Sequence, residues 1–225
     1  LCFTNQADPE VDVVFLCLCH GISGKFLSNM TFNKKTRVID LSNEFRLEGH
    51  TSFRDRDFVY GLPEYQKAAI RDARNIANPG CFATALQLAL LPLASKGRLS
   101  NSVHLNAITG STGAGAGLSE TTHFSWRNNN LSWYKPFTHQ HLGEVLQSLE
   151  SLQQERPELL FLPLRGNFSR GIFATAYTNF DGSLEQAKAL YGSFYQDARF
   201  TFLTDTPPAL KQVVNTNAAH LHLHK

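Results

Sequence analysis

Apolar runs separated by turn residues give the start of the chain a strand–helix–strand pattern. Residues 11–19 are almost continuously apolar, which is typical of a strand buried on both faces of a parallel sheet. The turn at 20–24 leads into a short helical stretch at 25–30, and residues 37–41 predict a second strand. We therefore expect a right-handed βαβ unit, with ligands at the carboxyl ends of its strands.

The pattern continues through a charged stretch into a third strand and a long helix. Residues 47–73 are charged and irregular, with a turn predicted at 60–64. Residues 74–77 predict a short strand that ends in Asn-Pro-Gly-Cys. The proline keeps the residue before it out of the helical region, and the glycine lets the chain turn. The apolar run that follows predicts a helix from Cys81 to Gly97.

The remaining pattern mixes strands and helices and predicts an α+β arrangement. Leu142, Val145 and Leu149 repeat at helical spacing, and Ser183 with Gln186 forms a capping-box pattern at the start of another helix. The expected strands cover 103–109, 159–164, 171–178 and 200–203, and the expected helices run from 142 to about 154 and from 183 to about 198.

Composition narrows the class of protein. The 225 residues are 42% apolar and 18% charged, which is typical of a soluble globular protein. A net charge of +2 without a basic run gives no sign of a nucleic-acid partner, and no apolar segment is long enough to cross a membrane. Cys2, Cys17, Cys19 and Cys81 show no Cys-x-x-Cys spacing, so we expect no metal site and a reducing cytoplasm. The chain starts and stops within its pattern, so we expect it to be part of a longer protein.

Cys81 is the first candidate for chemistry. A helix start offers free backbone N–H groups and the positive end of the helix dipole, which favour a thiolate. A thiolate is the nucleophilic form of cysteine. The alternative is that Cys81 is a small buried apolar residue, as many cysteines are.

A glycine-rich loop and a histidine cluster are the other candidates. Residues 110–117 follow a predicted strand and carry no side chain larger than threonine, so a ligand could approach their backbone and its N–H groups, although a flexible connector fits too. His139, His141 and Glu144 lie at the start of a predicted helix, where a histidine beside a carboxylate is a candidate general base. A metal site and a solvated helix start are alternatives. His220, His222 and His224 share one face of a predicted strand, which favours a half-exposed strand over a metal site.

The motifs together resemble the N-acetyl-γ-glutamyl-phosphate reductase family of arginine biosynthesis. Residues 76–85 match its active-site signature, and further motifs follow in the family's order over nearly the whole chain. These include 19–23, 40–47, 60–64, 110–115, 139–144, 170–172 and 215–217. The resemblance implies an α/β fold: a partial NADP-binding Rossmann domain at 1–80, and a catalytic and dimerisation α+β domain at 81–210, similar to the second domain of glyceraldehyde-3-phosphate dehydrogenase. Residues 211–225 would start the return to the Rossmann domain. The family's opening glycine-rich turn is missing from this sequence.

The same resemblance implies an activity and roles for particular residues. Cys81 would form a thioester from an acyl phosphate, NADPH would reduce it to the semialdehyde, and the protein would be a homo-oligomer, a dimer or a tetramer. His139 would be the acid–base group and Glu144 the carboxylate that orients it, with His141 a rival for the base. The implied cofactor residues are Gly21, Ser23, Ser111, Gly113, Gly115 and Asn217, and the implied substrate residues are Arg46, His141 and Arg170.

Other functions remain open at this point. A Cys/His/Glu hydrolase would use the same cluster without a nucleotide, and aspartate-semialdehyde dehydrogenase is the nearest other family with this architecture. A non-catalytic binding or assembly subunit is the third possibility, and it leaves the three polar positions unexplained. The sequence does not decide between an N-acetyl and an N-succinyl substrate.

Overall fold

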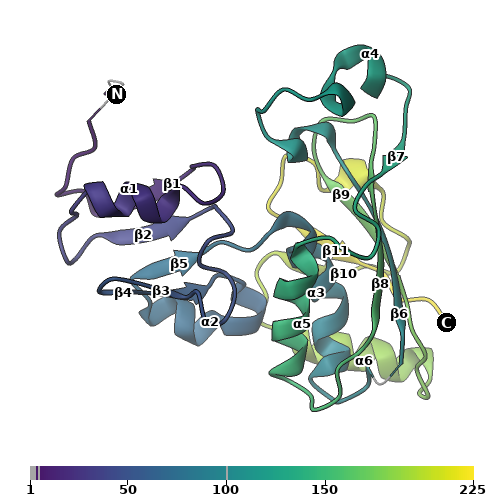
Figure 1. Ribbon diagram of the computed structural model, residues 1–225. Helices are drawn as coiled ribbons and strands as arrows, with labels where there is room; N and C mark the ends of the chain where they lie inside the picture. The colour runs from purple at the N-terminus through teal and green to yellow at the C-terminus, as the bar shows by residue number, and fades with distance from the viewer. Residues whose placement is uncertain (1–3, 5, 100) are drawn as a thin grey trace. The chain divides into compact units, whose positions relative to one another are not determined.

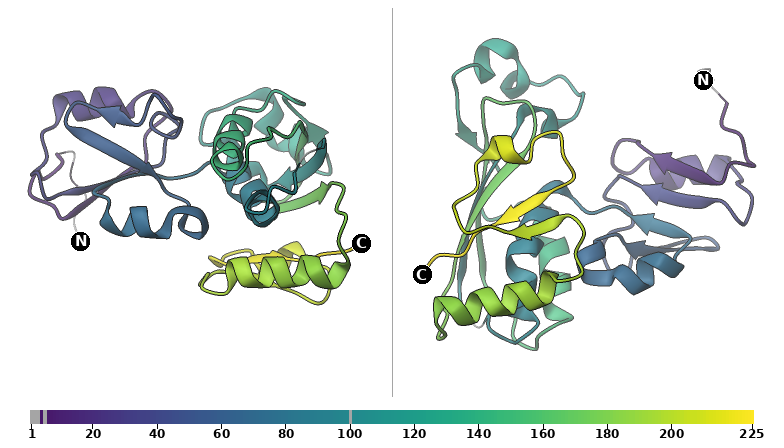
Figure 2. Two further views of the ribbon diagram at one scale, coloured as in Figure 1. Left: turned by 90° about the horizontal axis from the view of Figure 1, so that it is seen from below. Right: turned by 180° about the vertical axis from the view of Figure 1, so that it is seen from behind.

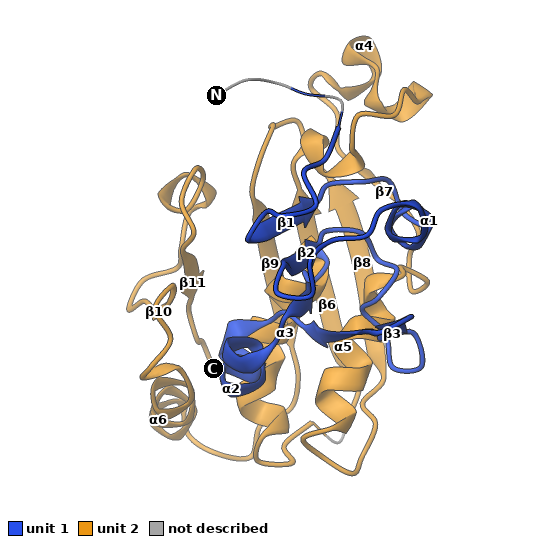
Figure 3. Cartoon of the chain, turned by 90° about the vertical axis from the view of Figure 1, so that its left-hand side faces the viewer, with its two compact units in different colours: residues 1–80 blue, residues 81–225 orange. Residues whose placement is uncertain are grey.

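The chain forms two compact units that divide between Gly80 and Cys81 (Figure 3). The computed structural model describes residue 4, residues 6–99 and residues 101–225. Cys2 lies outside the described residues. None of the described helices is long and apolar enough to cross a membrane.

The first unit is a mainly parallel sheet with two helices (Figure 1). Its strand order is β1-β2-β5-β4-β3, in which β1, β2, β5 and β4 pair in parallel and β3 pairs with β4 in antiparallel fashion. The predicted strand–helix–strand unit in a parallel sheet is therefore confirmed. The elements are β1 (Val13–Leu16), α1 (Ser23–Asn29), β2 (Arg37–Asp40), β3 (Ser52–Phe53), β4 (Arg56–Tyr60), α2 (Pro63–Asp72) and β5 (Asn75–Ala77).

The first strand is shorter and more exposed than its apolar sequence predicts. β1 covers four residues, and the side chain of Phe15 is 61% exposed while Leu16 is 3% exposed. Val14 and Leu16 pack on the described core, whereas Phe15 lies between them on the strand and its side chain is on the opposite face. Cys17 and Cys19 follow the end of the strand and are exposed free thiols.

The stretch at 47–73 was predicted to be irregular, and that prediction is wrong. It contains β3, β4 and α2. Phe58 and Tyr60 are buried although charged residues surround them, and the ring of Phe58 stacks on Phe45 with centroids 4.1 Å apart. Pro63, expected in a turn, is at the first turn of α2, where its missing N–H group costs no hydrogen bond.

The second unit is built on a four-stranded mixed sheet of order β7-β8-β6-β9. β6 pairs with β8 in parallel and with β9 in antiparallel fashion, which agrees with the predicted α+β class. Helices α3 and α5 lie side by side along one face of this sheet (Figures 1 and 2). The elements are α3 (Cys81–Ala94), β6 (Val103–Thr109), η1 (Ser111–Ala114), η2 (Glu120–Thr122), α4 (Phe124–Arg127), β7 (Ser132–Trp133), α5 (His141–Glu150), β8 (Leu159–Arg165), β9 (Ile172–Tyr177), α6 (Leu184–Tyr195), β10 (Thr201–Leu203), η3 (Leu210–Gln212) and β11 (Ala219–Leu221).

Helix α3 is the central element of this unit. Phe82, Leu86, Leu90 and Leu91 are at most 1% exposed, and each such side chain contributes about 1.5–3 kcal/mol on burial. Pro92 lies inside the helix and has no N–H group to give to the carbonyl four residues earlier. The hydroxyl of Tyr195 on α6 donates to that carbonyl, Leu88 O, at 2.6 Å. The helix therefore tolerates its internal proline, and α6 is fixed against it.

None of the described helices covers the outer face of the mixed sheet. Its side chains alternate with the buried ones, and the aromatic residues Phe173 and Tyr177 are 38% and 61% exposed. The three leucines at 160, 162 and 164 on β8 are half-buried there.

Helix α6 carries the predicted capping box, because Ser183 and Gln186 bond each other's backbone N–H groups. β10 pairs with β11 in parallel beside α6. Residues 211–225, predicted to begin a return to the first domain, belong to this second unit over their described length, and the return itself stays a prediction.

Candidate active site

Cys81 is the first residue of α3, as the sequence predicts, and its side chain is exposed. It lines a cavity of about 510 Å³ in the second unit. The cavity wall also includes Thr109 at the end of β6, Gly113 and Arg170. The alternative that Cys81 is a buried apolar residue does not hold.

The glycine-rich loop is held in place by a neighbouring segment. Its residues 111–114 form the short helix η1, in which the N–H groups of Ser111 and Thr112 donate to the carbonyls of Phe168 and Ser169 at 2.7 and 3.2 Å. A Cβ on Gly110 would lie 2.3 Å from Ser169 O, so only glycine fits there. The loop is therefore not a flexible connector, and two of the N–H groups expected for an anion are already used.

Some of the predicted cofactor and substrate residues of the second unit line the cavity, and others do not. Gly113 and Arg170 line it, whereas Ser111, Gly115 and Asn217 are not among its lining residues, although Thr216 and Ala218 on either side of Asn217 are. His220 also lines the cavity. Among the described residues no group of three His, Cys, Asp or Glu side chains could hold a metal ion.

His139 lies in an aromatic cage. Its side chain is 4% exposed, and its ring meets those of Phe82, Tyr134 and Phe161 edge-on at centroid distances of 5.4, 5.6 and 5.8 Å. Burial, followed by the neighbouring His141 and Lys135, lowers the pKa of His139 to about 4, against an opposing effect of Glu144. His139 is therefore neutral near pH 7.

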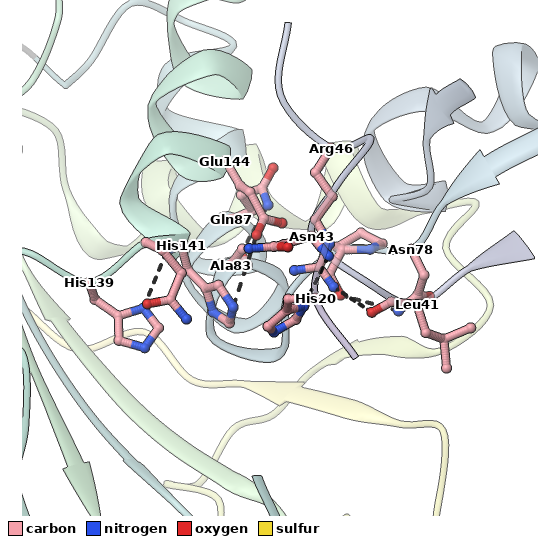
Figure 4. Close-up of polar contacts among 12 residues, drawn as sticks. His20, Leu41, Asn43, Arg46, Asn78, Ala83, Gln87, His139, His141 and Glu144 are labelled. Carbon is pink, nitrogen blue, oxygen red and sulfur yellow. Dashed lines mark hydrogen bonds and ion pairs between the residues drawn. The ribbon is translucent and has the colours of Figure 1, made fainter. Parts of the chain in front are cut away.

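The hydrogen bond at His139 assigns its tautomer. The backbone N–H of His141 donates to Nδ1 of His139 at 3.2 Å (Figure 4). Because Nδ1 accepts, the proton of the neutral ring is assigned to Nε2. His139 thus offers a hydrogen-bond donor from an apolar cage.

Glu144 lies beside His141, one turn along α5. Its Oε1 is 4.0 Å from Nε2 of His141, and the two residues are 3% and 8% exposed. The predicted shared helix face of His141 and Glu144 is present. The resemblance implies that Glu144 orients His139. In the structure the ion-pair contact of Glu144 is with His141 instead.

Tyr134 and Arg165 belong to the same neighbourhood and were not predicted. The guanidinium carbon of Arg165 lies 4.6 Å from the centroid of the Tyr134 ring. Burial raises the pKa of Tyr134, Arg165 opposes that rise, and the charge of Cys81 adds to it. The aromatic run at 133–137, directly before His139, was the available signal for Tyr134.

The predicted site residues of the first unit are at the carboxyl ends of its strands. Gly21 follows β1 with φ +75°, and a Cβ there would meet nothing within 4 Å. Ser23 is fully buried and donates to Asp40 Oδ1 at 2.5 Å, so its hydroxyl belongs to a network with Ser42. Arg46 is 5% exposed and donates from Nη2 to Leu41 O at 3.0 Å (Figure 4).

Comparisons with known proteins give consistent results for both units. The family model described as the semialdehyde dehydrogenase NAD binding domain matches residues 2–73, and that of the semialdehyde dehydrogenase dimerisation domain matches residues 81–225. N-acetyl-gamma-glutamyl-phosphate reductases from Christiangramia forsetii and Flavobacterium johnsoniae are 57% and 58% identical over 99% of this chain and 68% and 69% of their own lengths.

Solved structures support the fold. Aspartate semialdehyde dehydrogenase II from Vibrio cholerae superposes with a TM-score of 0.66 at 14% identity, over 94% of this chain and 69% of that one. The Candida albicans aspartate semialdehyde dehydrogenase with NADP gives a TM-score of 0.55 at 13% identity, over 89% of this chain and 63% of that one. At these identities the likeness concerns the fold alone.

Proposed function

The chain belongs to the N-acetyl-gamma-glutamyl-phosphate reductases of the semialdehyde dehydrogenase family, and from this we propose that it reduces an N-acyl-γ-glutamyl phosphate to the 5-semialdehyde and phosphate in arginine biosynthesis. The observation that carries the proposal is Cys81, which is exposed at the start of α3 and lines a cavity. The buried histidines do not line that cavity, but the ring of Phe82, the residue after Cys81, contacts both His139 and His141. A cytoplasmic setting agrees with the free thiols of Cys17, Cys19 and Cys81.

In the proposed reaction Cys81 is the nucleophile. Its thiolate forms a bond to the acyl carbon of the substrate, the bond to the phosphate oxygen breaks, and phosphate leaves. The resulting thioester is an activated acyl group. The nicotinamide cofactor, when bound, supplies the hydride that reduces this group to the aldehyde.

The proposed acid–base roles follow from the two histidines. His141, beside the carboxylate of Glu144, is assigned to take the thiol proton of Cys81. His139, neutral and protonated at Nε2, is assigned to donate a hydrogen bond to the oxygen of the reacting carbonyl. These assignments exchange the roles that the resemblance implies for the two residues.

The family models support an NAD(P)-binding enzyme, and NADP(H) is the proposed form. Gly21 fits this group, because its open surroundings and left-handed backbone leave the turn after β1 accessible to a ligand. In the second unit Gly113 and Arg170 would face the cofactor or substrate from the cavity wall. Ser23, Arg46, Ser111, Gly115 and Asn217 keep their roles as proposals.

The test is a nucleotide-dependent assay with the intact protein. We expect phosphate- or arsenate-dependent reduction of NADP⁺ by N-acyl-glutamate semialdehyde, with both acyl forms assayed and aspartate semialdehyde giving much slower turnover. Calorimetric titration should show NADP⁺ binding more tightly than NAD⁺. A protein that binds neither nucleotide and hydrolyses acyl esters would be the Cys/His/Glu hydrolase instead.

We further propose that the outer face of the mixed sheet is the homodimer contact. The matched family model is that of a dimerisation domain, and this face presents Phe173, Tyr177 and the β8 leucines without a covering helix. A tetramer would need a second contact.

Replacing Leu162 with arginine is expected to convert the dimer to monomer, because a charge would be buried in the contact without a partner. Sedimentation or light scattering would measure the mass. The matched control, Ser193→Arg, places the same charge on an exposed position of α6 and should leave the mass unchanged. A Leu162→Arg protein that stays folded and dimeric would exclude this face.

A further inference from the structure

We propose that Arg165 binds a carboxylate of the substrate at the edge of the Cys81 cavity. The inference rests on the proposed function and adds to it a residue that sets substrate affinity. Neither the motifs nor the resemblance pointed to Arg165.

The register of the sheet places Arg165 next to the cavity. Arg165 ends β8 directly opposite Thr109 of β6, and Thr109 lines the cavity together with Cys81. Side chains two residues apart on a strand share a face, so Arg165 lies on the same face as the buried Phe161 and Pro163. That face is the one against which α3 and α5 pack.

The guanidinium of Arg165 is held from one side by an aromatic ring. It stacks over Tyr134, whose ring lies 5.6 Å from that of His139 between centroids. The charges of Arg165 and Cys81 both act on Tyr134, so the cation and the nucleophile lie within electrostatic reach of one phenol. Tyr134 and Arg165 also share a side-chain hydrogen bond, and the guanidinium has further N–H groups that can meet a planar anion.

The charge of Arg165 has no anionic partner among the described residues. No described carboxylate pairs with it, and its Nε is enclosed without a hydrogen-bond partner. A second cation, Arg127, is close enough to act on it electrostatically: Arg127 is 5% exposed, and its pKa is lowered first by burial and then by Arg165.

The N–H groups of Arg127 are already used in hydrogen bonds within the protein. It donates to Arg165 O at 2.6 Å, to Thr121 O and to Ser132 Oγ, so its N–H groups hold the end of β8 in place. Two neighbouring cations, one of them buried, are unfavourable unless an anion joins them. The proposed substrate supplies carboxylates, which fit the fork of a guanidinium.

Two carboxylates could occupy this position. Every N-acyl-glutamyl substrate has the α-carboxylate, and an N-succinyl group would add a second one. Comparing the two acyl forms in the same variant therefore identifies which one Arg165 holds.

The experiment measures binding and turnover in Arg165→Gln of the intact protein. We expect the KM for N-acyl-glutamate semialdehyde to rise about 10- to 100-fold, because a charge-assisted hydrogen bond is lost, with little change in the KM for NADP⁺. A rise for both acyl forms assigns the α-carboxylate, and a rise for the N-succinyl form alone assigns the acyl carboxylate. Arg165→Lys, which keeps the cation without the fork, should fall between wild type and Arg165→Gln.

Arg199→Gln is the matched control, because Arg199 also lies over an aromatic ring, that of Phe200, but is exposed. It should leave both KM values unchanged. Calorimetry of N-acetylglutamate and N-succinylglutamate binding to Cys81→Ser, with and without Arg165→Gln, gives a readout without turnover. Unchanged Kd values for both ligands would overturn the role of Arg165, and so would an unchanged affinity in Arg165→Lys if the glutamine variant does not fold. A wild-type protein inactive with both semialdehydes would instead overturn the proposed function.

Discussion

Cys81→Ser is expected to lower the rate of NADP⁺ reduction by N-acyl-glutamate semialdehyde by at least about 10³-fold. A serine hydroxyl is not appreciably ionised near pH 7, whereas a thiol at a helix start is readily converted to its thiolate. A serine ester would also be a less activated acyl group than the thioester. The loss should appear in kcat, because the cavity that holds the substrate is unchanged.

The fold should survive this substitution. The Cys81 side chain is exposed, so the free energy of unfolding should change by less than about 0.5 kcal/mol. Cys17→Ser removes another exposed thiol, outside the proposed site, and should keep full activity. Cys17→Ser should be inactivated by iodoacetamide like the wild type, and mass spectrometry of the inactivated protein should find the label on Cys81. Substantial turnover by a folded Cys81→Ser protein would refute the thioester route.

The elements around Cys81 could be predicted because their signals are local. The Asn-Pro-Gly turn bends the chain before residue 81, and the apolar run after it is long enough to predict a buried helix. The same holds for the capping box at Ser183, whose two hydrogen bonds join residues three apart.

The first unit shows where local signals fail. The apolar run at 11–19 predicts that its residues are buried. Which of them are buried depends on the face of the sheet that each side chain occupies. In β1 the face that carries Val14 and Leu16 packs on the core, and Phe15 on the other face stays exposed. Between 47 and 73 the charged residues obscure the strand β4, in which Phe58 and Tyr60 are the two buried residues.

In the candidate site, too, the contact between sequence neighbours could be predicted and the long-range contact could not. Spacing placed His141 and Glu144 on one helix face, and the structure has them 4.0 Å apart. Arg165 and Thr109 are 56 positions apart and meet only through the parallel register of β8 and β6. No periodicity within either strand encodes that register, so the cation over Tyr134 could not be found from the sequence.

The roles of the two histidines lead to the second large expected effect. His141→Asn should lower kcat/KM about 10²- to 10⁴-fold, because it removes the proposed general base. His139→Asn should cost about 10²- to 10³-fold, because it removes one hydrogen-bond donor to the reacting oxygen. The expected losses of kcat/KM for the two variants overlap in size. The pH dependence of kcat/KM is therefore the measurement that distinguishes the two roles.

Burial lowers the pKa of His139 from its ordinary 6.5 to about 4, so this ring is already neutral above about pH 5 and does not change charge between pH 5 and 8. A limb of the kcat/KM profile that rises with pH in this window therefore reports another group. We expect His139→Asn to retain that limb at a lower rate and His141→Asn to lose it, with exposed His50→Asn matching the wild type. The opposite pattern, a limb lost in His139→Asn and kept in His141→Asn, would return the base to His139 and require a proton on Nδ1 that the His141 N–H group does not permit.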